Sequence, residues 1–175
     1  NLDAEDFKIC ICKQENIKKW QDYIPATKGV LIGGFDLLNE WMVRSELRDA
    51  LIKLYVRNLK TDKEEELVIT NEKVITPGTS LMQKNRNTNK LYIAYNSPKT
   101  PGKSYIYDIA TKEKKLVKEE IVPSGHNPDD YIVERLNCNS HDNRKIPLTI
   151  TRHKKTKIDG NANLLLYAYG SYGAS

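Results

Sequence analysis

The sequence contains no apolar run long enough to cross a membrane. Its longest apolar stretches, Val30 to Phe35 and Leu164 to Tyr169, are far shorter than the roughly 20 residues that a transmembrane helix needs. The opening residues are acidic and polar, so they do not resemble a signal peptide. The chain also begins without Met, which predicts that the true N-terminus lies upstream. We therefore expect a cytoplasmic protein that has no membrane partner.

Cysteine is scarce, and its three residues, Cys10, Cys12 and Cys138, do not form a disulfide framework. Cys10 and Cys12 alternate with Ile9 and Ile11, so on a strand both thiols point to the same face, a poor geometry for pairing with each other. A two-cysteine metal site is one interpretation of this spacing. Buried thiols in a cytosolic protein are the favoured one, and we expect no metal or other cofactor.

Acidic residues are outnumbered, because 28 Lys and Arg against 23 Asp and Glu give a formal net charge of +5. The hydrophobic content of 39% is ordinary for a globular protein and too high for a disordered one. A basic patch can bind nucleic acid, but here it flanks strand-like residues and no nucleic-acid motif accompanies it. We interpret it as a solvated, lysine-rich sheet edge without a nucleic-acid partner. The patch consists of Arg144, Lys145, Arg152, Lys154, Lys155 and Lys157.

Short strand patterns separated by turn-forming residues fill the first 120 residues and predict a mainly β fold there. Each pattern shows some alternation of apolar and polar residues, as a half-buried strand does. The expected strands are Phe7–Cys12, Trp20–Ile24, Gly34–Glu40, Trp41–Glu46, Leu51–Asn58, Glu66–Ile69, Ser80–Gln83, Lys90–Tyr95, Ser104–Ile109 and Lys115–Val117.

A weak internal repeat organises these strands. Residues 54–61 align with 104–111 at an offset of 50, and 67–68 then align with 116–117 if one residue is deleted. Residues 7–24 look like the tail of an earlier unit. Units of four short strands and roughly 40–50 residues are typical of propeller blades, although a generic antiparallel sandwich also fits. About two and a half blades cannot close a ring, so the repeat predicts part of a larger object.

The character of the sequence changes after position 120. Residues 121–130 are rich in Pro, Gly, Asn and Asp, which is typical of a connector. Strands are then expected at Tyr131–Asn139 and Lys145–Lys154. Between them, Asp142 and Asn143 both tolerate positive φ and favour a tight hairpin turn. A second domain is therefore expected from residue 131 onward.

The last expected strand, Leu164–Ala168, is fully apolar, as a central strand of a mostly parallel sheet would be. It runs into Tyr-Gly-Ser-Tyr-Gly-Ala-Ser at 169–175, and this segment resembles the third strand and following loop of the hydrolase domain in the prolyl oligopeptidase family. The form of the motif is particularly similar to the oligopeptidase B (protease II) branch. Residues 131–136 and 142–148 resemble the hairpin before it, residues 92–101 resemble the last propeller blade, and residues 20–25 resemble an earlier blade.

The resemblance implies a fold and a domain organisation for the whole chain. Residues 1–120 would form the C-terminal blades of a seven-bladed β-propeller, about two and a half of them. Residues 121–130 would be the connector, and 131–175 would be the first strands of an α/β-hydrolase domain that stops before the nucleophile.

The resemblance also implies a function for the complete protein. Members of the family are serine oligopeptidases, and the oligopeptidase B branch cuts after Arg or Lys in short peptides, with the propeller excluding larger substrates. The expected partners are thus short basic peptides and the remaining part of the peptidase domain. In α/β-hydrolases the Ser, Asp and His of the triad follow the third strand. Since no Gly-x-Ser-x-Gly elbow occurs here, we expect this chain alone to be inactive.

One catalytic contributor is implied by the family motif. The second Tyr of Tyr-x-Tyr-Gly lends its hydroxyl to the oxyanion hole, and it corresponds to Tyr169; from spacing alone, a Tyr that merely packs at a strand end is favoured, and only the resemblance favours the oxyanion role. Ser171 follows a Gly directly and follows the wrong strand, so it is not expected to be the nucleophile. His126, His141 and His153 are interpreted as surface histidines.

Two other functions stay open at this point. The chain could be one subunit of a split enzyme whose second chain supplies the nucleophile. It could also be a non-enzymatic, propeller-like module that binds peptides in a groove.

Overall fold

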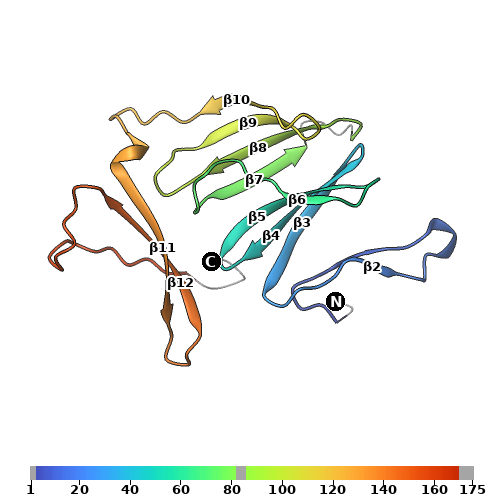
Figure 1. Cartoon of the computed structure of the whole chain (residues 1–175), viewed down its shortest axis with the longest axis horizontal. Helices are drawn as coiled ribbons and strands as arrows, with labels where there is room; N and C mark the ends of the chain where they lie inside the picture. Colours follow the sequence, from blue (N-terminus) through green and yellow to red (C-terminus); the bar gives the residue numbers. More distant parts are fainter. Residues whose placement is uncertain (1–2, 82–85, 170–175) are drawn as a thin grey trace.

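The computed structural model describes residues 3–81 and 86–169, and these residues form four antiparallel sheets. In Figure 1 the first three sheets spread like a fan, and the β11–β12 hairpin lies to one side of them. The expectation of a mainly β chain is confirmed. The strands are β1 (Ile9–Ile11), β2 (Gln21–Ile24), β3 (Val30–Leu38), β4 (Trp41–Arg48), β5 (Leu51–Asn58), β6 (Glu64–Glu66), β7 (Thr76–Leu81), β8 (Lys90–Asn96), β9 (Lys103–Asp108), β10 (Lys114–Glu119), β11 (Tyr131–Asn139) and β12 (Lys145–His153), with 3₁₀ segments η1 (Gln14–Asn16) and η2 (Pro128–Asp130).

Two of the sheets are four-stranded meanders in which each strand pairs with the next one along the chain, β3 to β6 and β7 to β10. Tight turns make this possible. Between β4 and β5, Asp49 and Ala50 have φ of 49° and 58°, as a two-residue type I′ hairpin turn requires. Strand β8 alternates between buried and less buried residues, so the β7–β10 meander has two distinct faces.

The repeat found in the sequence is confirmed as a shared turn at the end of the third strand of each meander. Asn58 Oδ1 accepts hydrogen bonds from the N–H groups two and three residues later, at 2.9 and 3.0 Å. Asp108 Oδ1 does the same at 3.0 and 3.2 Å. The left-handed residues of the two turns, Asp62 (φ 58°) and Lys112 (φ 63°), are also 50 positions apart. An acceptor side chain at this position replaces a backbone partner in the turn.

The deletion that the sequence alignment required is wrong. Glu66 pairs with Tyr55, and Leu116 pairs with Tyr105, so the offset of 50 continues to the outermost strand. The fourth strands of the two meanders differ instead in length and register. Strand β6 ends at Glu66, whereas β10 continues beyond the equivalent Leu116 and has a register shift between Leu116 and Lys118. An irregularity of this kind inserts one extra residue on one strand only.

Three expected strands lie elsewhere than predicted, and the one expected at Gly34–Glu40 is β3, at Val30–Leu38. Strand β6 ends where the expected strand Glu66–Ile69 begins, because the apolar residues that follow leave the sheet and enter the core. Strand β7 begins at Thr76, before the expected start at Ser80, and includes Pro77. Proline is tolerated because β7 is an edge strand. Gln83, at the end of the expected strand, lies outside the described residues.

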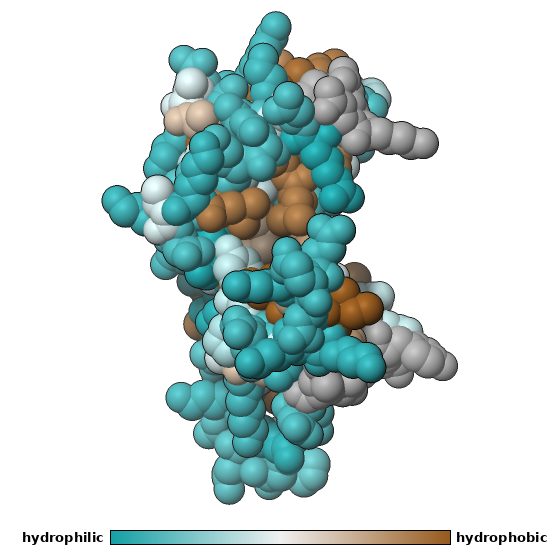
Figure 2. Space-filling model, turned by 90° about the vertical axis from the view of Figure 1, so that its right-hand side faces the viewer, coloured by the Kyte–Doolittle hydropathy of each residue, from teal (hydrophilic) through white to brown (hydrophobic). Residues whose placement is uncertain are grey.

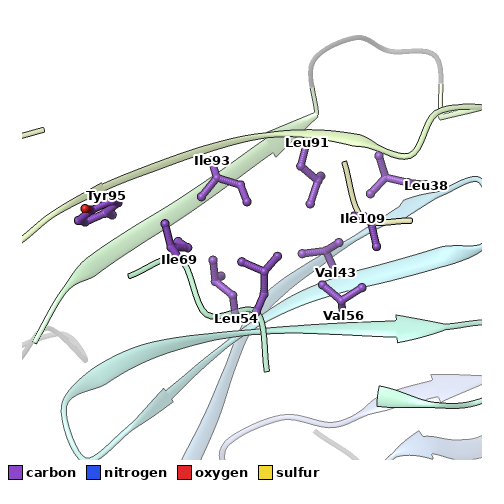
Figure 3. Packing of buried hydrophobic residues seen from close by; sticks show 10 residues of the cluster. Leu38, Val43, Leu54, Val56, Ile69, Leu91, Ile93, Tyr95 and Ile109 are labelled. Carbon is purple, nitrogen blue, oxygen red and sulfur yellow. The ribbon is translucent and has the colours of Figure 1, made fainter. Parts of the chain in front are cut away.

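The main core lies between the two meanders. Figure 3 shows side chains from β4 and β5 pointing toward those from β8. Burying one large aliphatic side chain contributes about 1.5–3 kcal/mol, so these contacts dominate the packing of the two sheets. The buried members are Leu38, Val43, Leu54, Val56, Leu67, Ile69, Leu91, Ile93, Tyr95 and Ile109.

A smaller core lies on the opposite face of the first meander, toward the β1–β2 sheet. Its buried members are Ile9, Ile24, Ile32 and Met42, with Tyr23 and Leu37 packed against them. The β3–β6 meander therefore contacts a neighbouring sheet on each face, as an internal blade of a propeller does.

The β11–β12 hairpin forms where it was expected, and all nine residues of each strand are paired. Its turn differs from the prediction, because only Asn143 has a positive φ, of 62°, whereas Asp142 does not. Asn143 N donates to Ser140 O at 3.0 Å, and Ser140 N donates to Arg144 O at 2.8 Å. The loop is thus three residues long with a single left-handed residue, rather than a two-residue turn.

The expected strand Leu164–Ala168 is not formed. The side chains of Leu164, Leu165 and Leu166 are 85%, 91% and 79% exposed, and the segment has no regular structure. A central strand of a parallel sheet needs strands on both sides and cover on both faces. No described strand pairs with this segment, so its apolar sequence is not matched by burial.

The surface is largely hydrophilic in the view of Figure 2, with smaller hydrophobic areas exposed near its middle. Neither helical segment of the described chain is long and apolar enough to cross a membrane. The three cysteines are free, but they are half-buried rather than buried as expected. The strands that carry Cys10 and Cys138 belong to two-stranded sheets, which bury fewer side chains than the meanders do.

Candidate functional site

The structure places Tyr169 on the surface, in an irregular segment, with 57% of its side chain exposed. It does not bring Tyr169 together with any of the three histidines. Ser171, the serine weighed as a nucleophile, lies outside the described residues. The oxyanion role of Tyr169 therefore stays a prediction.

Two of the histidines flank Tyr131 at the start of the β11–β12 hairpin. The ring of His126 stacks on Tyr131 with centroids 5.2 Å apart, and the ring of His153 meets Tyr131 edge-on with centroids 5.6 Å apart. The surface interpretation holds for His126 and His141, which are exposed, and is wrong for His153, which is half-buried. His153 is covered because β12 pairs it directly with Tyr131.

Hydrogen bonds fix the orientation of both rings. His126 Nε2 donates to the carbonyl of Lys99 at 2.7 Å, since a carbonyl can only accept. His153 Nδ1 accepts from the backbone N–H of Lys155 at 3.1 Å. Neither ring faces a serine hydroxyl within hydrogen-bond distance in the described residues. The contacts of both rings are therefore with the start of the hairpin, the residues just after β12 and the Lys99 carbonyl.

An ion pair and a backbone hydrogen bond also hold the base of the hairpin together. Lys154 Nζ lies 2.6 Å from Asp130 Oδ1, and Lys154 N donates to Asp130 O at 2.7 Å. The hydrogen bond from Lys154 lowers the pKa of the Asp130 carboxyl below its usual range. The end of the connector and the end of β12 are thereby fixed side by side.

A second contact joins the hairpin to the first meander. Arg135 on β11 donates to the carbonyl of Asp49, in the β4–β5 turn, and to Thr149 Oγ1 at 2.7 Å. Next to this contact lies a cavity of about 540 Å³, whose lining includes Gly33 and Glu46 as well as Arg135. The cavity thus lies between the ends of the meander strands and the hairpin.

Charged side chains are buried on the face of the first meander that looks toward β1–β2. The side chains of Arg44 and Glu46 are only 5% and 3% exposed, and they pair at 2.8 Å. Arg44 also donates to both carboxylate oxygens of Glu64, and Arg48 Nε donates to the other oxygen of Glu46 at 2.7 Å. The Arg44 guanidinium lies over the Tyr55 ring, 4.7 Å from its centroid. No buried side-chain nitrogen or oxygen in the described residues lacks a hydrogen-bond partner.

The electrostatics of this cluster favour its charged state. Burial opposes the charge on Arg44, but hydrogen bonds to Glu64 and Glu46 outweigh it and raise the pKa of Arg44. Toward the rim, Arg57 lies over Tyr23 of β2, 4.7 Å from the ring centroid, while Tyr23 Oη donates to Asp62 at 3.3 Å. These rim contacts connect the β1–β2 sheet to the meander.

The first 120 residues match a known domain, described as prolyl oligopeptidase, N-terminal beta-propeller domain. The chain belongs to the prolyl oligopeptidase family. Its stacked meanders are thus part of the propeller of this family, and the antiparallel sandwich is excluded. Several branches of the family match, so the branch is not decided by similarity alone.

Two relatives and one solved structure illustrate the similarity. The chain is 33% identical over 175 residues to dipeptidyl aminopeptidase BI of Pseudoxanthomonas mexicana, covering 98% of this chain and 24% of that protein. It is 25% identical over 182 residues to the dual function macrocyclase-peptidase POPB of Galerina marginata, covering 100% and 24%. Oligopeptidase B from Trypanosoma brucei superposes with a TM-score of 0.76 at 24% identity, over 86% of this chain and 22% of that one. The chain therefore spans about a quarter of the length of these relatives.

The described residues contain no group of three or more His, Cys, Asp or Glu side chains that could hold a metal ion. The buried ion cluster and the His126–Tyr131–His153 stack were both missed by sequence reasoning. The cluster had one usable signal, because Arg44, Glu46 and Arg48 share one face of a strand that was expected to be half-buried.

Proposed function

We propose that this chain is the closing part of the propeller and the first part of the peptidase domain of a serine oligopeptidase. In this proposal residues 1–120 are consecutive blades of a seven-bladed ring, 121–130 are the connector, and 131–175 begin the α/β-hydrolase domain. The complete enzyme hydrolyses short peptides in the cytoplasm, and its propeller limits the size of the substrates that enter.

The observation that carries the proposal is the order of the elements. Two meanders that bury a shared core are followed by a connector and then by a hairpin. The hairpin contacts the first meander through Arg135, and the connector contacts the second meander through His126. A propeller domain that passes directly into a second domain is what a substrate-filtering peptidase needs. The relatives named above are peptidases about four times longer than this chain.

Activity of the chain alone is the first test. We expect no hydrolysis of Arg or Lys amide substrates and no labelling by a fluorophosphonate probe, because the serine elbow and its Asp and His are missing from the sequence. Labelling of Ser171 together with turnover would contradict the proposal. Activity that returns when a second chain carrying the nucleophile is added would instead identify a split enzyme.

The role of Tyr169 is tested in the complete enzyme. Replacing Tyr169 with Phe removes only the hydroxyl, and we expect kcat to fall by roughly 10²–10³ with a much smaller change in KM, as for other lost oxyanion donors. A fall in kcat of less than about threefold would remove Tyr169 from the mechanism.

Substrate preference has two candidates. The motif at 169–175 favours cleavage after Arg or Lys, whereas the relative from Pseudoxanthomonas mexicana is named a dipeptidyl aminopeptidase. The two are separated by peptides that end in an Arg anilide. An enzyme of the first kind cleaves them whether or not the N-terminus is blocked, and an enzyme of the second kind requires a free amino group two residues before the cut.

A further inference from the structure

The connector contacts the turn between β8 and β9 through the side chain of His126, and Glu120 Oε2, just before the connector, accepts from Gly102 N of the same turn at 3.0 Å. The backbone of Glu120 also pairs with Gly102 at 2.8 Å, at the start of the connector. Beyond it, the N–H groups of Gly125 and Asp130 donate within the connector, and the contacts of Asp130 O and Oδ1 go to Lys154 at the end of the hairpin, not to the second meander. His126 is therefore placed to fix the position at which the connector turns toward the hairpin.

The acceptor for His126 is the backbone carbonyl of Lys99, so the turn that presents it must be held rigidly. Ser97 Oγ accepts the N–H groups of Lys99 and Thr100 at 3.2 and 2.8 Å, and Ser97 N donates to Thr100 O at 3.0 Å. Pro98 restricts the backbone further because its φ is fixed. The direction of the Lys99 carbonyl is thus set by Ser97 and Thr100.

Both hydroxyl groups of this turn are held by one carboxylate. Ser97 Oγ donates to Glu72 Oε2 at 2.6 Å, and Thr100 Oγ1 donates to Glu72 Oε1 at 2.7 Å. Thr100 is only 5% exposed. Glu72 itself lies between β6 and β7, in the segment that passes from the first meander to the second, and it is 25 residues before Ser97.

We propose that Glu72 is a positioning residue for the second domain. It holds the Ser97–Thr100 turn, the turn presents the Lys99 carbonyl to His126, and His126 stacks on Tyr131 at the root of the hairpin. The segment that separates the two meanders is thereby coupled to the direction in which the connector leaves the propeller. This inference concerns only contacts within the described chain and does not depend on the proposed substrate or catalytic residues.

The test is amide hydrogen exchange of the 175-residue chain, at a concentration where wild type and variants sediment alike. We compare Glu72→Ala, His126→Ala and the double variant, with Glu113→Ala as a matched control for loss of a turn carboxylate. His126→Ala should speed exchange in 121–131 roughly fivefold, the effect of one typical hydrogen bond on a local opening equilibrium. Glu72→Ala should speed exchange in 121–131 by a similar factor, although Glu72 does not contact these residues directly. Exchange in β8 should stay unchanged in this variant, and the Glu113→Ala control should exchange like wild type in 121–131.

The double variant should exchange no faster than His126→Ala alone, because the two residues act on one path. Unchanged exchange in 121–131 for Glu72→Ala, or additive effects of the two changes, would overturn the proposal. If Glu72→Ala also loosens β8, Thr100→Val decides, since it keeps the side-chain volume and removes one hydroxyl. A rise of about twofold confined to 121–131 would support the proposal, and no rise would overturn it.

Discussion

The two faces of the β3–β6 meander use different physical means to hold a neighbouring sheet. Toward β7–β10, ten buried side chains form an almost wholly apolar core (Figure 3). Toward β1–β2, only four residues form a buried apolar cluster, and charged groups such as Arg44 and Glu46 are buried on the same face of the meander. Apolar contact is not directional, whereas ion pairs and ring contacts require a defined geometry. The first interface should therefore carry most of the stability, and the second should respond to charge, salt and pH.

The apolar interface is expected to give the largest single effect. Leu54 is 3% exposed within the main core, and Leu54→Ala should lower the free energy of unfolding by about 3 kcal/mol, through lost burial and the cavity left behind. Urea unfolding measures this change. Leu59→Ala, at a residue that is 37% exposed, is the control. A loss below about 1 kcal/mol at Leu54 would mean that the two meanders are not held together by this core.

The buried ion cluster should give the next largest effect. Glu46→Ala leaves Arg44 with Glu64 alone and leaves Arg48 without its carboxylate, so we expect a loss of about 2 kcal/mol, somewhat below that for a fully orphaned buried charge. Unfolding of Lys60→Ala, which removes an exposed pair with Glu40, serves as the control and should match wild type.

A double replacement sharpens the same comparison. Arg44→Met combined with Glu46→Leu should recover at least half of that loss, because apolar residues of similar volume often replace a buried ion pair without cost. If the double variant is less stable than Glu46→Ala, the charges contribute more than the geometry of the site indicates.

The parts of this structure that local sequence could predict are those in which the chain's own neighbours decide the outcome. Strands β5 (Leu51–Asn58) and β11 (Tyr131–Asn139) have the predicted bounds, because alternation and flanking turn formers are local signals. The repeat at Asn58 and Asp108 was visible for the same reason. The irregular, exposed state of Leu164–Ala168 was not predictable from the sequence, since burial of an apolar strand depends on partner segments far away in sequence.

The candidate site was less predictable than the fold. Tyr169 came from a family motif, and its position on the surface adds nothing to that expectation. The Glu72 contact joins residues 25 and 28 positions apart through hydroxyl groups, and no periodic pattern marks such a contact. The spacing of residues along β4 is enough to deduce which face of the strand holds Arg44. It is not enough to deduce that a neighbouring sheet covers this face.

A smaller effect is expected at the rim of the polar interface. Tyr23→Leu removes the ring under Arg57 and the hydroxyl bonded to Asp62, and should lower the free energy of unfolding by about 0.5–1 kcal/mol at low salt. Tyr23→Phe keeps the ring and should lose less than half as much. Equal losses for the two variants, measured by urea unfolding, would assign the contact to the hydroxyl and not to the cation–π pair.

The smallest predicted effect is a pH dependence that belongs to the polar side only. Asp22 on β2 lies 2.9 Å from Lys8 Nζ and accepts from the Cys10 thiol at 3.4 Å. The hydrogen bond from Lys8, followed by that from Cys10, lowers the pKa of Asp22 below its usual range. A carboxyl whose folded pKa is depressed stabilises the fold at pH above its unfolded value, and this contribution disappears as the pH falls through the folded pKa.

Backbone amide shifts of Ile9–Ile11 should therefore move as the pH falls below the unfolded Asp value, about 3.9, before those of Leu91 and Ile93 change. Asp22→Asn should remove that early movement because it cannot titrate, and it should leave the amides of the main core as they are in wild type. If Asp22→Asn shows the same early movement at Ile9–Ile11, then other carboxylates control the β1–β2 sheet, and the contrast between the two faces of the meander is not one of charge.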